Sequence, residues 1–279
     1  MRETFEFRVP EDRAEKYLPP GCGKDLGGTV RKVILDSRDP LVAEIARLQK
    51  QLDAEGRSFF HGWDIRRHYS RHEVETAELF CVFAKRYFEP AGEECGTLYD
   101  DSKACTECGA GAVQTTPLFL SGGRIPRKVN FASTIADEFV VSSRVVDLFR
   151  AHGLRGAEFE PVRLSNKRGA PSQEHFQLNI VGPRVELDIA KTRLGSGLFD
   201  ESGYGRCSQG HVAGLNIISE VTVLRQSIPD ADIMATRQLF GVHRGILRPR
   251  PFILLSPKAW KAIDEAKLGG LTVEVAHLV

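Results

Sequence analysis

The sequence predicts a mixed α+β fold arranged in two lobes. Apolar and polar residues alternate in several short segments, as in half-buried strands, while other segments show helical spacing of apolar residues. A strand–helix–strand pattern also occurs twice, near the middle and at the end of the chain. With 279 residues, 42% of them hydrophobic, the chain is long enough for two such lobes. We place the lobes at residues 1–165 and 166–279, sharing one interface.

In the first hundred residues, each predicted element has a local physical reason. Three strands are predicted, at residues 5–9, 30–35 and 79–88, because their apolar and polar residues alternate or because they are rich in β-branched and aromatic residues. A helix is predicted to begin after Asp39, which can cap it, with Pro40 in the first turn, where a missing N–H costs nothing. Its apolar side chains recur at helical spacing, at Leu41, Ile45, Leu48 and Leu52.

Beyond residue 110, further strands are predicted between loops. Strand-like segments lie at residues 112–120, 176–180, 185–189 and 217–224. Residues 167–172 are the best candidate for a linker between the lobes, and residues 195–205 form a glycine-rich loop.

Two segments of the chain share one order of elements. Residues 140–160 and 254–274 each begin as a strand, reach a serine that can cap a helix, and leave that helix through leucine and glycine. A glutamate follows in the second strand at the same offset. Either the segments arose by duplication, or they share only the chemistry that every strand–helix–strand unit needs.

The charge balance excludes a strong overall attraction to nucleic acid or to an anionic membrane. Lys and Arg number 38 against 37 Asp and Glu, so only a local basic patch could serve. No apolar run approaches the ~18 residues of a membrane span, and the first residues do not resemble a signal peptide. Six cysteines, two of them in CxxC spacing, suit reduced thiols. The expected compartment is therefore the cytoplasm.

The most informative motif is Cys-Thr-Glu-Cys-Gly at residues 105–109. Two cysteines two residues apart, followed by glycine, form a tight turn that aims the thiolates of Cys105 and Cys108 at one point. Such a turn is a zinc knuckle, which supplies half of a tetrahedral structural zinc site. The alternative is a pair of buried free thiols.

The other half of the zinc site must come from elsewhere in the chain. Cys207 and His211 have a spacing that suits a ligand pair, and we predict them as the remaining two ligands. Cys95 is the alternative ligand, because Cys95-Gly96 could be the remnant of another CxxCG in which Gly92 replaces the first cysteine. The sequence shows no nucleophile elbow, Walker loop or zincin motif. We therefore expect structural rather than catalytic zinc, and no catalytic residue is assigned.

Two basic clusters give weaker signals. His68 and His72 would share one face of a helix, a spacing used for metal pairs, although a solvated polar connection also explains them. Five arginines are weak candidates for contacts with an acidic partner: Arg66, Arg67, Arg244, Arg248 and Arg250.

The cysteine turn and the later helix resemble a bacterial family of double-CxxCG proteins and a related group of immunity proteins from polymorphic-toxin systems. The residues that carry the resemblance are Tyr99-Asp100 before the turn, the turn itself, and residues 141–144 and 154–162. The first CxxCG of the family pattern is degenerate here, with Cys95 alone retained.

The resemblance implies a cytosolic, non-catalytic protein that binds and neutralises a cognate bacterial toxin. Structural zinc would anchor loops to its scaffold, because metal-binding energy becomes folding energy. Two other functions remain open from the residues: a zinc-containing nucleic-acid-binding protein, and a metal-dependent, nuclease-like enzyme that uses His68 and His72.

Overall fold

The computed structural model describes residues 1–195, 197–199, 207–212, 216–241 and 243–279. These residues divide into two compact units, Met1–Thr76 and Ala77–Val279. Both units combine strands with helices, so the predicted α+β class is confirmed. None of the helices in the described part of the chain has both the length and the apolar character needed to cross a membrane.

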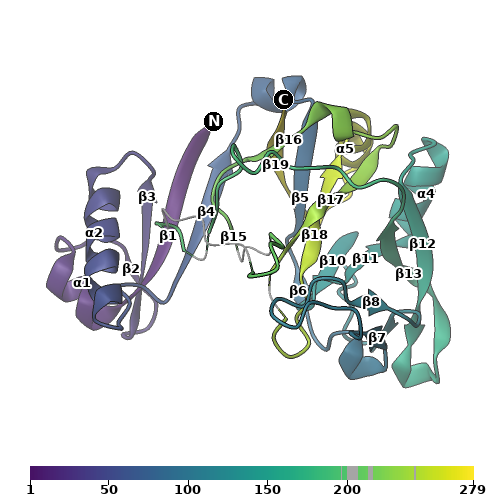
Figure 1. The fold of residues 1–279 in the computed structure, drawn as a ribbon, viewed down its shortest axis with the longest axis horizontal. Coiled ribbons are helices and arrows are strands. Elements are labelled where there is room, and N and C mark those ends of the chain that lie inside the picture. The colour runs from purple at the N-terminus through teal and green to yellow at the C-terminus, as the bar shows by residue number, and fades with distance from the viewer. Residues whose placement is uncertain (196, 200–206, 213–215, 242) are drawn as a thin grey trace. The chain divides into compact units, whose positions relative to one another are not determined.

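The smaller unit is an antiparallel sheet with short helices. Its strands are β1 (Arg2–Pro10), β2 (Lys24–Asp25), β3 (Val30–Asp36) and β4 (Gly62–His68), and its helices are α1 (Glu11–Tyr17), α2 (Pro40–Ala54) and α3 (Arg71–Thr76). The strand order is β2-β3-β1-β4. In Figure 1, α1 and α2 lie on one face of this sheet.

Helix α2 forms for the reason that the sequence suggests. The Asp39 carboxylate accepts a hydrogen bond from Leu41 N at 2.9 Å, and Pro40 stands in the first turn. The apolar stripe of this helix is buried at Val42, Ile45, Leu48 and Leu52. Burial of that stripe, together with fully buried Phe7 on β1, makes the core of the unit.

In its described residues, the larger unit contains two main sheets, two short strand pairs and two α-helices. The strands of the sheets are β5 (Leu79–Ala84), β6 (Tyr87–Phe88), β9 (Phe119–Leu120), β10 (Phe131–Thr134), β11 (Phe139–Ser142), β12 (Ala157–Leu164), β13 (Ala170–Ile180), β16 (Val221–Val223), β17 (Ile233–Phe240), β18 (Arg250–Leu255) and β19 (Leu271–Leu278). The short pairs are β7 (Tyr99–Asp100) with β8 (Val113–Gln114), and β14 (Leu194–Gly195) with β15 (Asn216–Ile217). The helices are α4 (Ser143–Ala151) and α5 (Pro257–Glu265). The sheet orders are β6-β10-β11-β13-β12-β9 and β16-β19-β5-β18-β17.

Several predicted boundaries differ from the structure. The division of the chain lies at Thr76, whereas the predicted boundary at 165/166 falls inside the larger unit. The predicted linker, residues 167–172, covers the end of the tight connection between β12 and β13 and the first residues of β13, where Leu164 pairs with Ala170. A short polar segment that contains glycine occurs in hairpin turns as well as in linkers between domains. The composition of residues 167–172 therefore could not distinguish the two.

The predicted strands at 5–9, 30–35 and 176–180 are present and extend further than expected, as β1, β3 and β13, whereas the other predicted strands are shorter or broken. Residues 79–88 split into β5 and β6, residues 112–120 into β8 and β9, and residues 217–224 contain only the end of β15 and then β16. Residues 185–189 make isolated bridges rather than a strand. Most of the glycine-rich loop at 195–205 lies outside the described residues.

The two sheets share a core of four strands built in the same order. In each, a hairpin (β10-β11 or β17-β18) leads into a helix (α4 or α5) and a further strand (β12 or β19). In the first sheet, β13 lies between β11 and β12 and runs antiparallel to both. In the second sheet, β5 lies between β18 and β19 and runs antiparallel to both. Figure 1 shows β5 beside β18, and β13 beside β12.

The inserted strands are exchanged between the two halves. Strand β5 precedes the first hairpin in the chain, and β13 precedes the second. We define the first repeat as residues 79–164 and the second repeat as residues 170–278. Each repeat is then a strand, a hairpin, a helix and a strand, and each gives its first strand to the sheet of the other.

Equivalent hydrogen bonds support duplication over shared local chemistry. Ser142 N donates to Asn130 O at 3.0 Å, and Ser256 N donates to Asp232 O at 2.8 Å. The side chains repeat this, since the hydroxyl of each serine bonds the side-chain oxygen of the same partner, at 2.9 and 3.0 Å. Ser256 Oγ also accepts from Ala259 N and caps α5, whereas Ser142 makes no such capping bond to α4.

The bonds between the repeats are reciprocal. Ile233 N of the second repeat donates to Arg155 O of the first at 3.1 Å, while Phe131 N of the first donates to Gly269 O of the second at 3.3 Å. After the exchanged strands, Val181 N bonds Gly156 O and Lys85 N bonds Gly270 O, at 2.9 and 2.8 Å. A strand–helix–strand unit does not by itself require matching long-range partners. We therefore infer that the larger unit arose by duplication.

Candidate metal centre

The 105–109 turn lies in the loop between β7 and β8. Cys105 O accepts from Gly109 N at 2.7 Å, and Cys105 N donates to Ala110 O at 2.8 Å. Gly109 has a φ of 72°, and a Cβ there would lie 2.3 Å from His243 Cβ. Only glycine fits this close approach in a left-handed conformation, which explains the glycine after the second cysteine.

The second ligand pair lies on a similar turn in the other repeat. Gly210 N donates to Cys207 O at 2.9 Å, and Cys207 N donates to His211 O at 3.1 Å. Cys207 follows Cys105 by 102 residues, the separation that also relates Phe131 to Ile233, the first residues of β10 and β17. The two turns thus occupy corresponding insertions of the two repeats.

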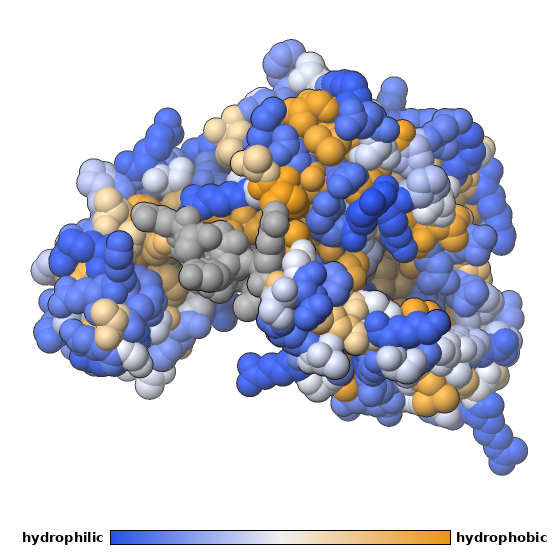
Figure 2. All heavy atoms as spheres, in the orientation of Figure 1, coloured by the Kyte–Doolittle hydropathy of each residue, from blue (hydrophilic) through white to orange (hydrophobic). Residues whose placement is uncertain are grey.

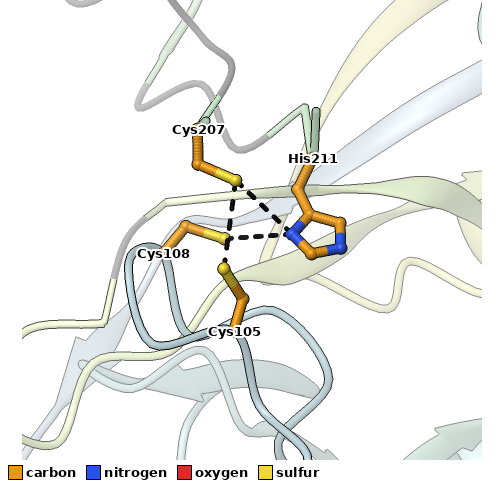
Figure 3. Close-up of side chains that lie close together, drawn as sticks. All are labelled: Cys105, Cys108, Cys207 and His211. Carbon is orange, nitrogen blue, oxygen red and sulfur yellow. Dashed lines mark hydrogen bonds between the residues drawn. The ribbon is translucent and has the colours of Figure 1, made fainter. Parts of the chain in front are cut away.

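The structure brings the four predicted ligands together. The ligating atoms of Cys105, Cys108, Cys207 and His211 all lie within 4.8 Å of one another (Figure 3). The Sγ atoms of Cys105 and Cys207 are 3.9 Å apart. His211 Nδ1 lies 3.6 Å from Cys108 Sγ and 3.5 Å from Cys207 Sγ.

These three separations are close to three of the six edges of a tetrahedron around one ion. With zinc-like bonds of about 2.3 Å to sulfur and about 2.0–2.1 Å to nitrogen, tetrahedral geometry gives sulfur–sulfur edges near 3.8 Å and sulfur–nitrogen edges near 3.6 Å. The cluster could therefore hold a metal ion with little rearrangement of the two turns.

The surroundings of the thiols differ. The backbone N–H groups of Cys108 and Glu107 lower the pKa of Cys105 to about 6. Burial, followed by the hydrogen bonds of the Cys105 and Cys207 thiols, raises the pKa of Cys108 to about 11. A divalent cation at the centre would favour the thiolate form of every cysteine, including Cys108, whose pKa is otherwise raised.

A carboxylate that does not reach the cluster joins the two ligand turns. Glu107, inside the first turn, accepts from Ser208 N at 2.9 and 3.1 Å and from Ser208 Oγ. The Ser208 hydrogen bonds lower the pKa of Glu107, so its charged form persists. Because Ser208 follows Cys207, this contact fixes one turn against the other.

Glu107→Ala should weaken metal binding without removing a ligand. We expect a loss of about 10–100-fold in affinity for Zn²⁺, the usual effect of removing such outer support, measured by competition with a chromophoric chelator. Glu160→Ala is the matched control, since Glu160 is an exposed carboxylate on β12. Equal affinities for the two variants would show that the Glu107–Ser208 contact does not organise the site.

The alternative ligand Cys95 does not join the cluster. It ends a short 3-10 helix, Glu93–Cys95, outside the four-residue group. A Cβ on Gly92 would lie 2.5 Å from a Glu138 oxygen and 2.6 Å from Leu118 Cδ1. The 92–96 turn therefore has no room for the missing cysteine, and Gly92 N instead donates to Glu138 at 2.8 Å.

The predicted His68/His72 pair is wrong. His68 is the last residue of β4, and its Nε2 lies 3.1 Å from Thr4 Oγ1. His72 stands in the first turn of α3. The two residues share no helical face, because the strand continues to residue 68 and the helix begins only at residue 71.

Two of the predicted partner-binding arginines are buried and paired within the protein. The Arg67 side chain is only 3% exposed and lies 3.1 Å from Glu3. Arg248 is 6% exposed, bonds Asp101 and Glu93 at 2.6–3.1 Å, and covers the Tyr99 ring at 4.3 Å. These contacts stabilise the fold and make neither side chain available to a partner.

The other three arginines are more accessible. Arg250 Nη2 donates to Tyr99 Oη at 3.2 Å and is half-buried. Arg66 is half-exposed and pairs with Glu6 at 2.8 Å and Asp64 at 3.3 Å, and Arg244 is exposed. A role of Arg66 and Arg244 in partner binding stays a prediction.

The sequence did not reveal the Glu107–Ser208 contact or the bond from His243 N to Cys108 O at 3.1 Å. No model of a known protein family matches this chain, and no curated protein matches it. The resemblance to double-CxxCG proteins therefore stays a hypothesis.

Proposed function

We propose that this chain is a non-catalytic binding protein stabilised by a structural zinc ion. The observation that carries the proposal is the set of three thiols and one imidazole within 4.8 Å of one another, with three of their separations close to tetrahedral edges. Cys₃His is a common donor set of structural zinc sites, and soft thiolate ligands favour zinc over magnesium or calcium.

The surroundings of the cluster do not favour catalysis by the metal. A catalytic zinc keeps one coordination position open and has an acid or base nearby, whereas the four side chains of this cluster would fill a tetrahedral site. Glu107, the carboxylate within the knuckle, is committed to Ser208. In the described residues, no second group of three or more potential metal ligands accompanies this one.

The zinc ion would join the two repeats. Cys105 and Cys108 come from the first repeat, and Cys207 and His211 from the second. Cys207 is partly buried and packs against the small apolar group of Cys108 and Ala110. Binding energy at the metal would therefore become folding energy for both loops.

The partner class follows from the resemblance to immunity proteins: a cognate bacterial toxin, bound in the cytoplasm. Hydrophilic side chains cover most of the face shown in Figure 2. Such a surface suits recognition through charge and hydrogen bonding, which gives specificity for one partner. Zinc would hold the shape of that surface without taking part in contacts.

Co-expression with the toxin encoded beside its gene tests this function. We expect the wild-type protein and Cys95→Ser to restore growth of cells that produce the toxin, and Cys207→Ser to fail because its loops are released. Failure of folded, zinc-loaded wild-type protein to protect, together with no complex in a binding titration, would contradict the immunity role. A protein that protects but contains no zinc would contradict the structural-zinc role instead.

A further inference from the structure

A pocket separate from the metal ligands lies where the two repeats meet. Its volume is about 400 Å³, within the usual range of small-molecule sites. Strands β5 and β18 line it together with the end of β13 and the residues entering β11. Because β5 and β13 are the exchanged strands, both repeats contribute equivalent segments to its walls.

Equivalent positions in this pocket have diverged in chemistry. The matching bonds of Lys85 and Val181 make Phe83 the counterpart of Asn179. Asp137 lies in the connection before β11, whereas Pro251, at the same distance before the second serine, lies within β18 and pairs with Leu239. The pocket wall is polar at Asn179 and Asp137 and apolar at Phe83 and Pro251.

One side of the pocket is aromatic. The Phe240 and Phe252 rings stack with centroids 3.7 Å apart, and Phe83 meets Phe252 edge-on at 5.6 Å. Stacked and edge-on rings offer a flat apolar surface on which another planar ring can lie. Stacking of this kind is the usual way that proteins hold a nucleobase.

The other side carries charged groups with unused bonding capacity. Arg250 Nε is buried and has no hydrogen-bond acceptor among the described residues. The Arg184 guanidinium and the Asp137 carboxylate also line the pocket, and both residues keep part of their surface open to solvent. The charge of Arg250 acts on Asp137. Asp137 also has a φ of 58°, an uncommon conformation for a residue other than glycine.

We propose that this pocket binds a nucleoside monophosphate. Arg184 and Arg250 supply cations and fixed N–H donors that suit a phosphate. Asp137 supplies the acceptor for the N–H groups of a base, and the Phe83, Phe240 and Phe252 cluster supplies the surface on which the base lies.

The titration of Asp137 agrees with a binding role. Although Asp137 keeps contact with solvent, partial desolvation by the surrounding protein raises the pKa of its carboxyl group, and the Arg250 guanidinium opposes that rise. Carboxyl groups perturbed by desolvation next to a specific charge occur preferentially at functional sites. The proposal does not rest on the zinc-stabilised binding function, since the pocket includes none of the metal ligands.

Isothermal titration of the full-length, zinc-loaded protein with GMP, AMP, CMP and UMP tests the proposal. We expect at least one of them to bind with a Kd below about 1 mM, more tightly than its nucleoside or inorganic phosphate. Arg184→Gln and Asp137→Asn should each weaken that binding about tenfold or more, because each removes a charged hydrogen-bonding group. Arg124→Gln, on an exposed arginine outside the pocket, should leave it unchanged.

Unchanged zinc content and melting temperature in each variant would show that the fold is retained, so a negative result here is separate from a failure of the metal site. Absence of binding by all four nucleotides would overturn the proposal. Equal binding of inorganic phosphate and of the best nucleotide would overturn it as well, as would full affinity in both pocket variants.

Discussion

Replacing Cys207 with serine will remove the metal from the protein and destabilise the larger unit. Cys207 is one of four ligands and comes from the repeat opposite to Cys105. Without its thiol, at most three of these side chains could hold the ion, and the 207–211 turn would lose its link through the metal to the 105–109 turn. We expect zinc content to fall from one equivalent to near zero and the free energy of unfolding to fall by about 4 kcal/mol or more. In a unit of this size that lowers Tm by about 8–16 °C.

Cys95→Ser is the matched control for this prediction. Cys95 is also a partly buried free cysteine of the larger unit, but it lies outside the metal cluster. Its replacement should leave zinc content at one equivalent and Tm within about 2 °C of wild type. Loss of zinc from Cys95→Ser with zinc retained in Cys207→Ser would reverse the assignment of the ligands. Elemental analysis and calorimetry of the purified variants give both quantities.

Gly156→Ala and Gly270→Ala will destabilise the larger unit by similar, large amounts. The two glycines are equivalent positions of the repeats, with φ values of 103° and 122°. A Cβ on Gly156 would lie 2.0 Å from Ile233 O, and a Cβ on Gly270 would lie 2.2 Å from Phe131 O. Backbone on both sides prevents relief of either clash, so we expect a cost of about 3 kcal/mol or more for each substitution. Thermal or urea unfolding measures this cost.

Alanine substitutions at Gly269 and Gly153 serve as controls, because neither added Cβ meets another atom. Gly269→Ala has open space around its Cβ and no left-handed backbone, so it should be nearly neutral. Gly153→Ala also has open space but a φ of 58°, so it measures conformational strain alone, about 1–2 kcal/mol. A mild effect of Gly156→Ala beside a severe effect of Gly270→Ala would contradict the equivalence of the two repeats.

Local chemistry explains why part of the fold was predictable from the sequence. The helix after Asp39 and the strand–helix–strand segments depend on caps, turn glycines and periodic apolar residues close together in the chain. The metal ligands were predictable because thiolate and imidazole chemistry restricts the residue types, and because both ligand pairs lie on tight turns. Their meeting across 102 residues required the fold itself.

Features that depend on distant partners were not predictable in the same way. The sequence around Arg248 is rich in arginine and proline and looks exposed, yet Asp101 and Glu93 bury and neutralise this side chain. Because β5 and β13 are exchanged between the two sheets, the segments before and after residue 165 form one compact unit. The His68/His72 spacing suits a helix, but pairing of β4 with β1 extends the strand through residue 68.

The central claim is that a structural metal joins the corresponding insertions of two duplicated repeats. Zinc K-edge X-ray absorption of the purified protein tests this claim most directly. The account predicts one zinc per chain with three sulfur ligands near 2.3 Å, one nitrogen ligand near 2.0–2.1 Å and no water ligand. A site with two sulfur ligands and additional oxygen, or a protein that contains no zinc, would contradict it.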